Sequence, residues 1–352
     1  MGGLLLRRWR TLSAIAPPPH AVRTAVHAFV RPPLFHTIPS TGPNGVLISR
    51  DGVMTQFRDF YKTLQHSALV DKLHVMSERP VFESIRVADQ LVSIGSTFLA
   101  MPPTGLEHRV TEWMETARYL RAAGGPTTLA GYLQDVDNLR CSSGDIVVLP
   151  TGIAVAHGSR TNAEAHQVLK QLFTIQDDHS NFEVLTLEQE TDAPPLGDYF
   201  GFAGNNLLIA WKDEHGLLAV NQYQKLRPND TLQTVFLEPG CHFFSFFGTD
   251  ATNDIIVQRG YDRSIESLIA HGLNPIPVQW SEMDKLGVSM RSAVLIARFL
   301  KVSVAGGLQQ RTRLRGSRWQ AHQLTGTTST APIQQAAAAA VDARGEPPPP
   351  QV

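Results

Sequence analysis

The sequence predicts an α/β protein built as a propeller-like array of repeated units, and three observations support this prediction. Short apolar runs of about four to six residues alternate with amphipathic helices of about two to four turns. Gly, Pro and Asp separate these runs, as they do in turns. The pattern of strand, turn, strand, helix and strand then returns about every 45–60 residues, a spacing typical of arrays of α/β units.

Each predicted strand is a short apolar run, and each predicted helix is amphipathic. The clearest unit joins a strand at Asp145–Leu149, a PTG turn, a strand IAVAHG, a helix at Asn162–Leu172 and a strand at Phe182–Leu185. The other expected elements, in chain order, are the helix Thr55–Gln65 and the strand Lys72–Met76; the strands Ala88–Ile94 and Thr97–Ala100 with the helix Glu107–Ala122; the strands Asn206–Trp211 and Leu217–Val220 around KDEHG; and the strands His242–Phe247 and Asp254–Gln258 with the helix Ser264–Ala270 and the strand Pro275–Gln279.

The two ends of the chain differ in composition from residues 46–300, which we expect to form the folded domain. The first 50 residues contain no Asp or Glu, although six arginines are spread through them. A basic, acid-poor and Ser/Thr-containing start is typical of a mitochondrial transit peptide, so residues 1–45 are interpreted as a matrix-targeting leader. A disordered basic N-terminus without a targeting role is the alternative.

Residues 301–352 are expected to be disordered. Four arginines, from Arg311 to Arg318, are followed by TGTTST, five alanines and a terminal proline-rich stretch. Such a composition buries too little apolar surface to offset the entropy lost on ordering. Its arginines could bind a polyanion, or the tail could be dispensable.

The cysteine content excludes a disulfide framework. Only Cys141 and Cys241 are present, and no C-x-x-C or H-x-E pair indicates a metal site, so neither a metal nor a cofactor is expected. No apolar stretch reaches the roughly 18 residues that a membrane span requires.

Three ordered blocks carry a resemblance to a known family. The segment GDIVVLPTGIAVAHGSRTNAEAHQVL (Gly144–Leu169) is similar to the G-D-V-L…S-x-R-T-N…L block of dimethylargininases in the pentein, or guanidino-group-modifying, superfamily. Leu196–Ala210 follows their H-L-K-S…A-G-x-N block, and Ser281–Ile296 follows their terminal S-E-L-x-K-x-D-G-x-x-T-C-x-S-V-L-I block. The resemblance covers about residues 46–300 and implies the pentein fold, a five-bladed propeller of ββαβ units around an axial pocket.

The catalytic groups of that family are replaced in this chain. The family attacks a guanidinium carbon with a cysteine thiolate, and a histidine acts as acid and base. The cysteine position falls on Arg291 or on Met290, depending on where one missing residue is placed, and the histidine position falls on Pro195. None of these side chains can perform the chemistry, so we expect no catalytic residue.

The substrate-binding positions are only partly retained. A glutamate position falls on Ala88, while Asp89 and Arg160 are kept, and His108 or Arg109 lies near the place of a family arginine. Together with Lys285 and Arg291, these residues are the candidate pocket set. Loss of carboxylates and gain of arginine predict a pocket that has shifted from cation toward anion binding.

Other groups could be proposed as substitutes. Cys141 lies just before the Gly144 block and could act as a relocated nucleophile, although a packed turn residue is the simpler interpretation. His157 and His166 flank the SRTN signature and are expected to have ordinary structural roles.

Non-catalytic proteins that resemble this family bind guide RNA in the mitochondrial RNA-editing complex of kinetoplastids, where two related pentein-fold chains form a dimer that holds the RNA 5′ end. The resemblance implies a comparable role here: a matrix protein that binds the 5′ phosphates of guide RNA, dimerises with itself or a pentein paralogue, and joins a larger ribonucleoprotein. Arginine forks suit phosphate oxygens. Two alternatives remain, an active dimethylargininase- or deiminase-like hydrolase and a structural assembly factor of a mitochondrial ribonucleoprotein.

Overall fold

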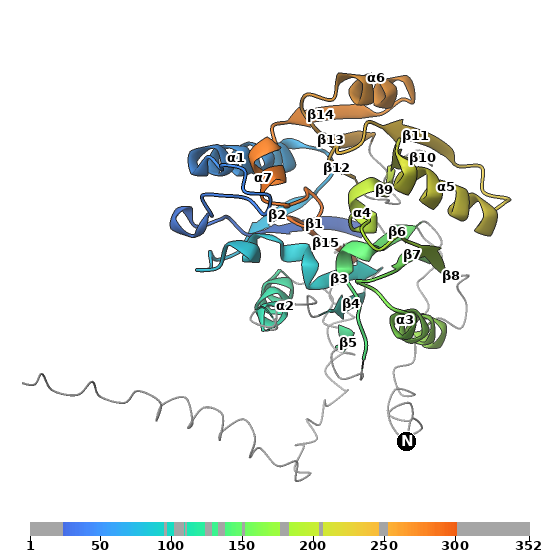
Figure 1. Cartoon of the computed structure of the whole chain (residues 1–352). Helices are drawn as coiled ribbons and strands as arrows, with labels where there is room; N and C mark the ends of the chain where they lie inside the picture. Colours follow the sequence, from blue (N-terminus) through green and yellow to red (C-terminus); the bar gives the residue numbers. More distant parts are fainter. Residues whose placement is uncertain are drawn as a thin grey trace, which may run out of the picture. The chain divides into compact units, whose positions relative to one another are not determined.

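Five three-stranded sheets make up the described part of the chain, and the prediction of an α/β protein is confirmed (Figure 1). The computed structural model describes residues 24–94, 97–101, 109, 111–123, 129–132, 138–149, 152–176, 183–203, 207–245 and 253–300. The predictions for residues 1–23 and 301–352 lie outside these ranges.

Four of the sheets repeat one connection. Their first strand pairs antiparallel with the second, and the second pairs parallel with the third after a helical crossover. The elements are β3 (Leu91–Ile94), β4 (Thr97–Ala100), α2 (Glu112–Ala122) and β5 (Leu129–Tyr132); β6 (Ile146–Leu149), β7 (Gly152–His157), α3 (Ala163–Gln176) and β8 (Glu183–Glu188); β9 (Phe200–Ala203), β10 (Leu207–Trp211), α5 (Glu214–Leu226) and β11 (Gln233–Leu237); and β12 (Phe243–Phe244), β13 (Asp254–Gln258), α6 (Asp262–Ala270) and β14 (Asn274–Val278).

The fifth sheet joins the two ends of the folded domain. It consists of β15 (Leu295–Leu300), β1 (Thr24–Val30) and β2 (Lys72–Val75), with α1 (Arg50–His66) between β1 and β2. The strand β1 is its middle strand, antiparallel to β15 and parallel to β2. The same ββαβ arrangement is therefore completed by strands from opposite ends of the domain.

The start of the domain predicted at residue 46 is therefore corrected to about residue 24. Ala28, Phe29 and Val30 are completely buried, and Arg31 is 1% exposed. The strand β1 lacks acidic residues because it is a buried middle strand. Its composition therefore does not indicate a targeting signal. Any cleaved leader has to lie within residues 1–23.

Local signals explain where the helices begin. Ser49 caps α1, where its hydroxyl accepts a hydrogen bond from the Gly52 amide at 3.0 Å. The buried residues Val53, Phe57, Phe60 and Leu64 then follow at spacings of three and four, so one face of α1 enters the core.

The strand predicted at Leu217–Val220 is wrong, because these residues lie inside helix α5. Asp213 accepts a hydrogen bond from the Gly216 amide at 2.8 Å and caps the helix that KDEHG opens. The predicted turn is thus a helix N-terminus. The other predicted strands and helices are present. The strands β4 and β13 coincide with their predicted ranges, and the remaining elements have shifted ends.

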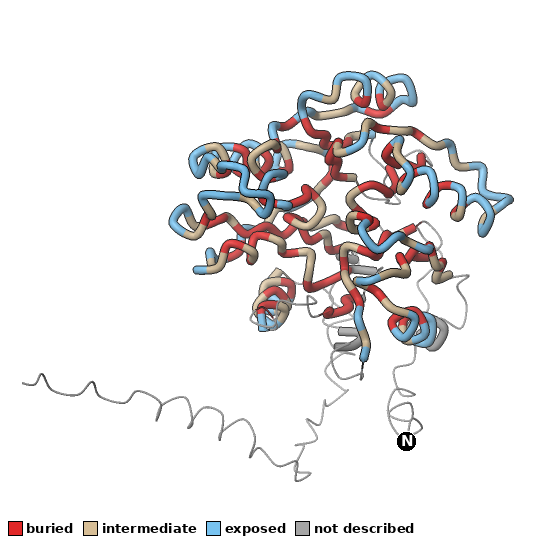
Figure 2. The backbone as a smooth tube through the Cα atoms, viewed as in Figure 1, coloured by how far each residue is buried: buried red, intermediate tan, exposed pale blue. Residues whose placement is uncertain are grey.

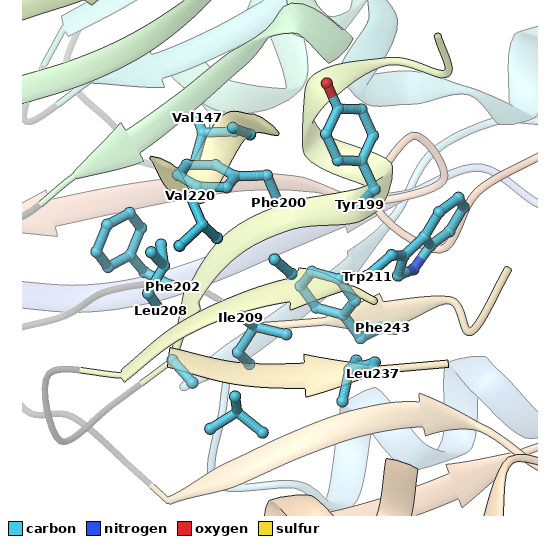
Figure 3. Packing of buried hydrophobic residues seen from close by; sticks show 14 of the residues in the cluster. Val147, Tyr199, Phe200, Phe202, Leu208, Ile209, Trp211, Val220, Leu237 and Phe243 are labelled. Atoms are coloured by element: carbon cyan, nitrogen blue, oxygen red, sulfur yellow. The ribbon is translucent and has the colours of Figure 1, made fainter. Parts of the chain in front are cut away.

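The core lies between the sheets and the helices that flank them. Figure 2 shows buried backbone along the strands and exposed backbone on the outer helices. The strand β10 is buried at all five positions, as a strand covered on both faces must be. Figure 3 shows aromatic side chains from successive elements, among them Phe200, Phe202 and Phe243, packed in one cluster.

Two short helices carry loop residues toward the sheets' common centre. These are α4 (Leu196–Tyr199), directly before β9, and α7 (Ser281–Lys285), before β15. Two 3-10 turns, η3 (Phe82–Ile85) and η4 (Val87–Asp89), precede β3 in the same way. Among the described residues, no helix combines the length and apolar character that crossing a bilayer requires.

Candidate functional site

A cavity of about 290 Å³, here called the polar cavity, opens where the first strands of several sheets begin. It is lined by three arginines, two aspartates and five serines, with small residues between them: Arg86, Asp89, Ser142, Ser143, Ser159, Arg160, Asp198, Ser289, Arg291 and Ser292, together with Ala88, Gly144, Pro195 and Gly287. The cavity is therefore rich in hydrogen-bond donors and carries one more basic than acidic side chain.

A second cavity of about 130 Å³, the axial cavity, is lined by residues of β3, β6, β9, β12 and β15. These are the first strands of all five sheets, so the sheets surround one common centre (Figure 1). Its lining is mostly apolar. Ala88, Ser143 and Arg291 line both cavities, and Arg291 thus stands at the boundary between the apolar and the polar space.

The structure separates the two candidates for the lost cysteine position. Arg291 lines the cavities, whereas Met290 is completely buried in the core beside α1 and α7. Arg291 donates a hydrogen bond to the Ile146 carbonyl. Burial lowers the pKa of its guanidinium, and the nearby Asp198 and Asp145 counteract this shift. The pocket position is therefore held by a cation in place of a thiol.

Gly197 provides the space for this arginine. A Cβ atom at residue 197 would lie 2.0 Å from Nη1 and 2.5 Å from Cζ of Arg291. Both distances are far below any van der Waals contact, so the guanidinium of Arg291 lies directly against the Gly197 backbone. In the resembling block this position is a lysine, which the arrangement of Arg291 excludes.

Gly197→Ala is expected to lower the free energy of unfolding by about 1–3 kcal/mol, because the new methyl group overlaps the Arg291 guanidinium. In an Arg291→Ala background the overlap is gone, and the same change should cost less by about 1 kcal/mol or more. Urea unfolding of the four proteins measures this coupling. An equal cost of Gly197→Ala in both backgrounds would contradict the contact.

Pro195 and Ala88, the other two lost positions, also face the polar cavity. Pro195 precedes α4, and a Cβ on Gly144 would lie 2.9 Å from its ring. Across the described residues, neither cavity is lined by a histidine or a cysteine. The described lining of the two cavities therefore provides no thiol that could act as a nucleophile.

Neither cysteine replaces the missing nucleophile. Cys141 is 3% exposed, and its Sγ lies 3.3 Å from Sδ of Met101. Burial raises the pKa of the Cys141 thiol to about 12, and it raises that of Cys241 to about 12 as well. Both groups therefore stay protonated and are poor nucleophiles at neutral pH.

Arg160 lines the polar cavity, and its side chain also stabilises the fold. Its Nη2 lies 3.0 Å from Oδ1 of Asp145, which is 1% exposed, and its Nη1 donates to the Ala193 carbonyl at 2.8 Å. Asp145 accepts further hydrogen bonds from Thr161 Oγ1 at 2.9 Å and from the Leu196 amide at 3.4 Å. This cluster ties the SRTN segment to the start of α4.

Two other candidates lie away from the cavity. Arg109 is completely buried and pairs with Glu112 at 3.2 Å and Asp89 at 3.3 Å. Lys285 lies on α7 and pairs with Glu282 at 2.7 Å. Neither side chain is part of the lining of the polar or the axial cavity, so contact of these two residues with a pocket ligand stays a prediction. His108 lies outside the described residues.

The two histidines near the SRTN segment also lie elsewhere. His157 pairs with Glu188 at 2.9 Å, and the ring of His166 packs against the ring of His157. Burial lowers the pKa of His166, whose Nε2 lies 3.1 Å from the Ala156 carbonyl oxygen. Structural roles for both are consistent with these contacts.

Sequence reasoning missed two charged residues of the polar cavity, Arg86 and Asp198. Arg86 follows η3, and its Nη2 donates to the Leu286 carbonyl at 3.1 Å. Its Nε–H is buried without an acceptor among the described residues. Asp198 lies on α4, where it replaces a serine of the resembling block. Neither belongs to a retained motif, so no sequence signal marked them.

The two aspartates of the cavity are unusually easy to protonate. Burial raises the pKa of Asp89 to about 6, although Arg86 and Arg109 act in the opposite direction. Burial also raises the pKa of Asp198, against the lowering effects of His242, a hydrogen bond from Ser289, and Arg291 and Arg86. At mildly acidic pH the cavity therefore becomes more cationic.

The sequence profile of the RNA-editing substrate-binding complex 5 protein family matches residues 25–301, that is, from β1 to the end of β15. This match confirms the predicted likeness to subunits of an RNA-editing complex. No curated protein sequence is significantly similar to the chain.

Solved structures with a similar fold include guanidino-group hydrolases. The dimethylarginine dimethylaminohydrolase (DDAH) of Pseudomonas aeruginosa, as a cysteine-to-serine variant with citrulline, superposes with a TM-score of 0.60 and 17% identity over 78% of this chain and 98% of that chain. The N-terminal domain of ArgZ, a cyanobacterial arginine dihydrolase, gives 0.58 and 14% identity over 77% and 97%. At this identity the likeness concerns the fold, and it confirms the resemblance to dimethylargininase-like penteins.

Proposed function

Because this chain belongs to the family of RNA-editing substrate-binding complex 5 proteins, we propose that it is a non-catalytic, RNA-binding scaffold subunit of a mitochondrial RNA-editing complex. Its fold is similar to that of guanidino-group hydrolases, but the pocket positions that carry catalysis in those enzymes hold other residues here.

The single observation that carries the non-catalytic part is the side chain of Arg291. It fills the space beside Gly197 and lines both cavities. A covalent thioimidate needs a thiolate at the guanidinium carbon and an acid/base group beside it. Within the described residues the two replaced positions hold an arginine and a proline, and both thiols are buried and protonated.

The RNA-binding part is supported by the chemistry of the polar cavity. Arginine donates in a planar fork that matches phosphate oxygens, and serine hydroxyls add neutral donors. A guide-RNA 5′ end presents a compact polyanion of that kind. The cavity contains three arginines and five serines, so a terminal phosphate is the part of an RNA that its lining suits best.

The proposal extends to the setting of the protein. We place it in the mitochondrial matrix, directed by a leader within residues 1–23, and as a dimer with itself or with a pentein paralogue inside a larger ribonucleoprotein. The basic segment from Arg311 to Arg318 is a further candidate for phosphate contacts.

A first experiment tests the absence of catalysis. The full chain, incubated with arginine and with methylated arginines, is expected to release no citrulline above the protein-free background, because no thiolate is available. A colorimetric ureido assay measures this. Turnover that disappears in a Cys141→Ser variant would overturn the non-catalytic assignment and favour the hydrolase.

A second experiment tests the scaffold role. The tagged full chain is purified from mitochondria after ultraviolet crosslinking, with and without RNase, and bound RNA is sequenced. Crosslinked guide RNA together with protein partners is the expected result. Partners that survive RNase without any crosslinked RNA would support a structural assembly factor and contradict direct RNA binding.

A further inference from the structure

The polar cavity contains a basic group that its surroundings leave unused. The Nε–H of Arg86 is buried and has no acceptor among the described residues, although its Nη2 is held by the Leu286 carbonyl. An unsatisfied buried donor of a charged group costs about 1–3 kcal/mol or more. Such a group calls for an acceptor, and because Arg86 lines the polar cavity, an anion bound there is a candidate for that acceptor.

The position of Arg86 is fixed on several sides. Asp89 follows it by one turn, with its amide donating to the Arg86 carbonyl at 3.2 Å. Gly287 lies opposite, in the left-handed region at a φ of 64°, and a Cβ there would be 3.5 Å from Nη2 of Arg86. The guanidinium is therefore ordered before any ligand binds, which lowers the entropy lost on binding.

A second cation reaches the same cavity from the other side. Arg291 extends from the segment before β15, and both arginines lower the pKa of Asp198, so their charges act on the same point. The hydroxyls of Ser289 and Ser292 line the same wall but already donate, to Asp198 and to the Ser289 carbonyl. Two guanidinium groups that face one cavity are the main elements of a phosphate-binding site.

The aspartates oppose an anion unless one of them is neutral. Asp89 lines the cavity and is faced by Arg86, Arg109 and Asp198, while Asp198 is faced by His242 and Arg291. Asp145 lies behind Arg291, paired with Arg160. An incoming anion repels the ionised carboxylates, so protonation of Asp89, whose pKa burial already raises to about 6, accompanies binding.

We infer that Arg86 and Arg291 form an anion subsite for a phosphate group, and that its binding places a proton on Asp89. The inference rests on the proposed function in that an RNA 5′ phosphate is one source of such a group, and a free phosphate-type anion is the other. It assigns the anchoring role to Arg86 in place of Arg109 and Lys285.

The sign of the pH dependence follows from proton uptake. Because bound anion raises the pKa of Asp89 further above about 6, the complex holds more protons than the free protein at neutral pH. Affinity therefore rises as the pH falls from about 8 toward 6 and levels off below that value.

Sulfate is the first probe, because it has the shape of phosphate and does not titrate in this pH range. Isothermal titration of the full chain at constant ionic strength is expected to show affinity that increases by about three- to tenfold between pH 7.5 and pH 6. Arg86→Gln should weaken sulfate binding by at least about tenfold, and the exposed Arg263→Gln on α6 serves as the matched control.

Asp89→Asn distinguishes a binding site from a damaged fold. It should bind sulfate more tightly than the parent at pH 7.5 and should lose the pH dependence, a gain that unfolding cannot produce. An unchanged pH slope in Asp89→Asn, or equal sulfate affinity in Arg86→Gln and Arg263→Gln, would overturn the subsite.

The source of the phosphate is separated by RNA probes. Short RNAs with a 5′ triphosphate or a 5′ hydroxyl are compared in the parent and in Arg86→Gln. A preference for the triphosphate that Arg86→Gln abolishes assigns the site to the RNA 5′ end, whereas equal RNA affinities with intact sulfate binding assign it to a free anion. Crosslinking to RNA without any sulfate site would leave the proposed function standing and remove the subsite alone.

Discussion

Replacing Glu112 with Gln is expected to lower the free energy of unfolding by about 3–5 kcal/mol, because it leaves buried arginines without their shared carboxylate. Glu112 is 2% exposed and lies 3.2 Å from Arg109 and 3.6 Å from Arg31, which are 0% and 1% exposed. It also lies 3.6 Å from Arg79 and accepts a hydrogen bond from Gln90. Removing this carboxylate leaves Arg109 with Asp89 and Arg31 with Glu115 as their remaining carboxylate partners, so each buried guanidinium loses part of its compensation.

Urea unfolding followed by tryptophan fluorescence measures this effect. Glu188→Gln is the matched control, since Glu188 is 69% exposed and pairs only with the half-exposed His157 in the described structure. The control should change stability by no more than about 0.5 kcal/mol. If the two isosteric substitutions cost the same, the buried network does not stabilise the fold in the way its geometry indicates.

Asp145→Ala is expected to cost about 3 kcal/mol or more, since several buried donors lose one acceptor together. The Asp145 carboxylate takes hydrogen bonds from Arg160, from the Thr161 hydroxyl and from the Leu196 amide. Each donor left unsatisfied in the interior adds its own desolvation cost. The change also frees the start of α4, which carries Asp198 to the polar cavity and Gly197 to the axial cavity.

The comparison variant is Asp213→Ala, the same substitution at the N-cap of α5. There a single capping hydrogen bond to the Gly216 amide is lost, which typically costs about 1 kcal/mol. Thermal and urea unfolding should rank the two variants clearly. A loss for Asp145→Ala no larger than that for Asp213→Ala would mean that water replaces the carboxylate at this point.

Both predictions concern buried ion-pair networks that hold residues beside the polar cavity in place. The Glu112 network holds Arg109 in the interior beside Asp89, and the Asp145 cluster holds Arg160 against the segment before α4. Arg160, which the family pattern retains, and Arg109, one of the two candidates for a second family arginine, are therefore held by buried carboxylates. The arginines that remain for a ligand are Arg86 and Arg291.

The sequence by itself predicted the fold class and the family, and it places no cysteine or histidine at the catalytic positions of the resembling blocks. Apolar runs alternating with helical stripes at a regular spacing require an α/β array, because each unit has to bury its strands between helices and neighbouring strands. The block from Gly144 and the two later blocks indicated the pentein relationship. The absence of a cysteine at either Met290 or Arg291 held in both alignments, so the missing nucleophile did not depend on the three-dimensional structure.

Composition alone placed the start of the folded domain too late, because an acid-poor segment can have more than one structural cause. An acid-poor start is typical of a targeting leader, yet it is equally typical of a buried middle strand such as β1. Its partner β15 lies more than 260 residues later in the chain, and no local window connects the two. The segment KDEHG similarly reads as a turn until the capping bond of Asp213 makes it the first turn of α5.

Only the tertiary structure decided which charges face the cavity. Arg109 and Arg86 are both arginines near the same strand, but Glu112 draws one into the interior while the Leu286 carbonyl holds the other at the cavity wall. Likewise, the guanidinium of Arg291 lies against residue 197 because this residue is a glycine, whereas the resembling block has a lysine there. The two residues are almost a hundred positions apart in the chain. The sequence gives the charge of each residue. Whether that charge is paired, buried or free to contact a ligand depends on neighbours that only folding brings together.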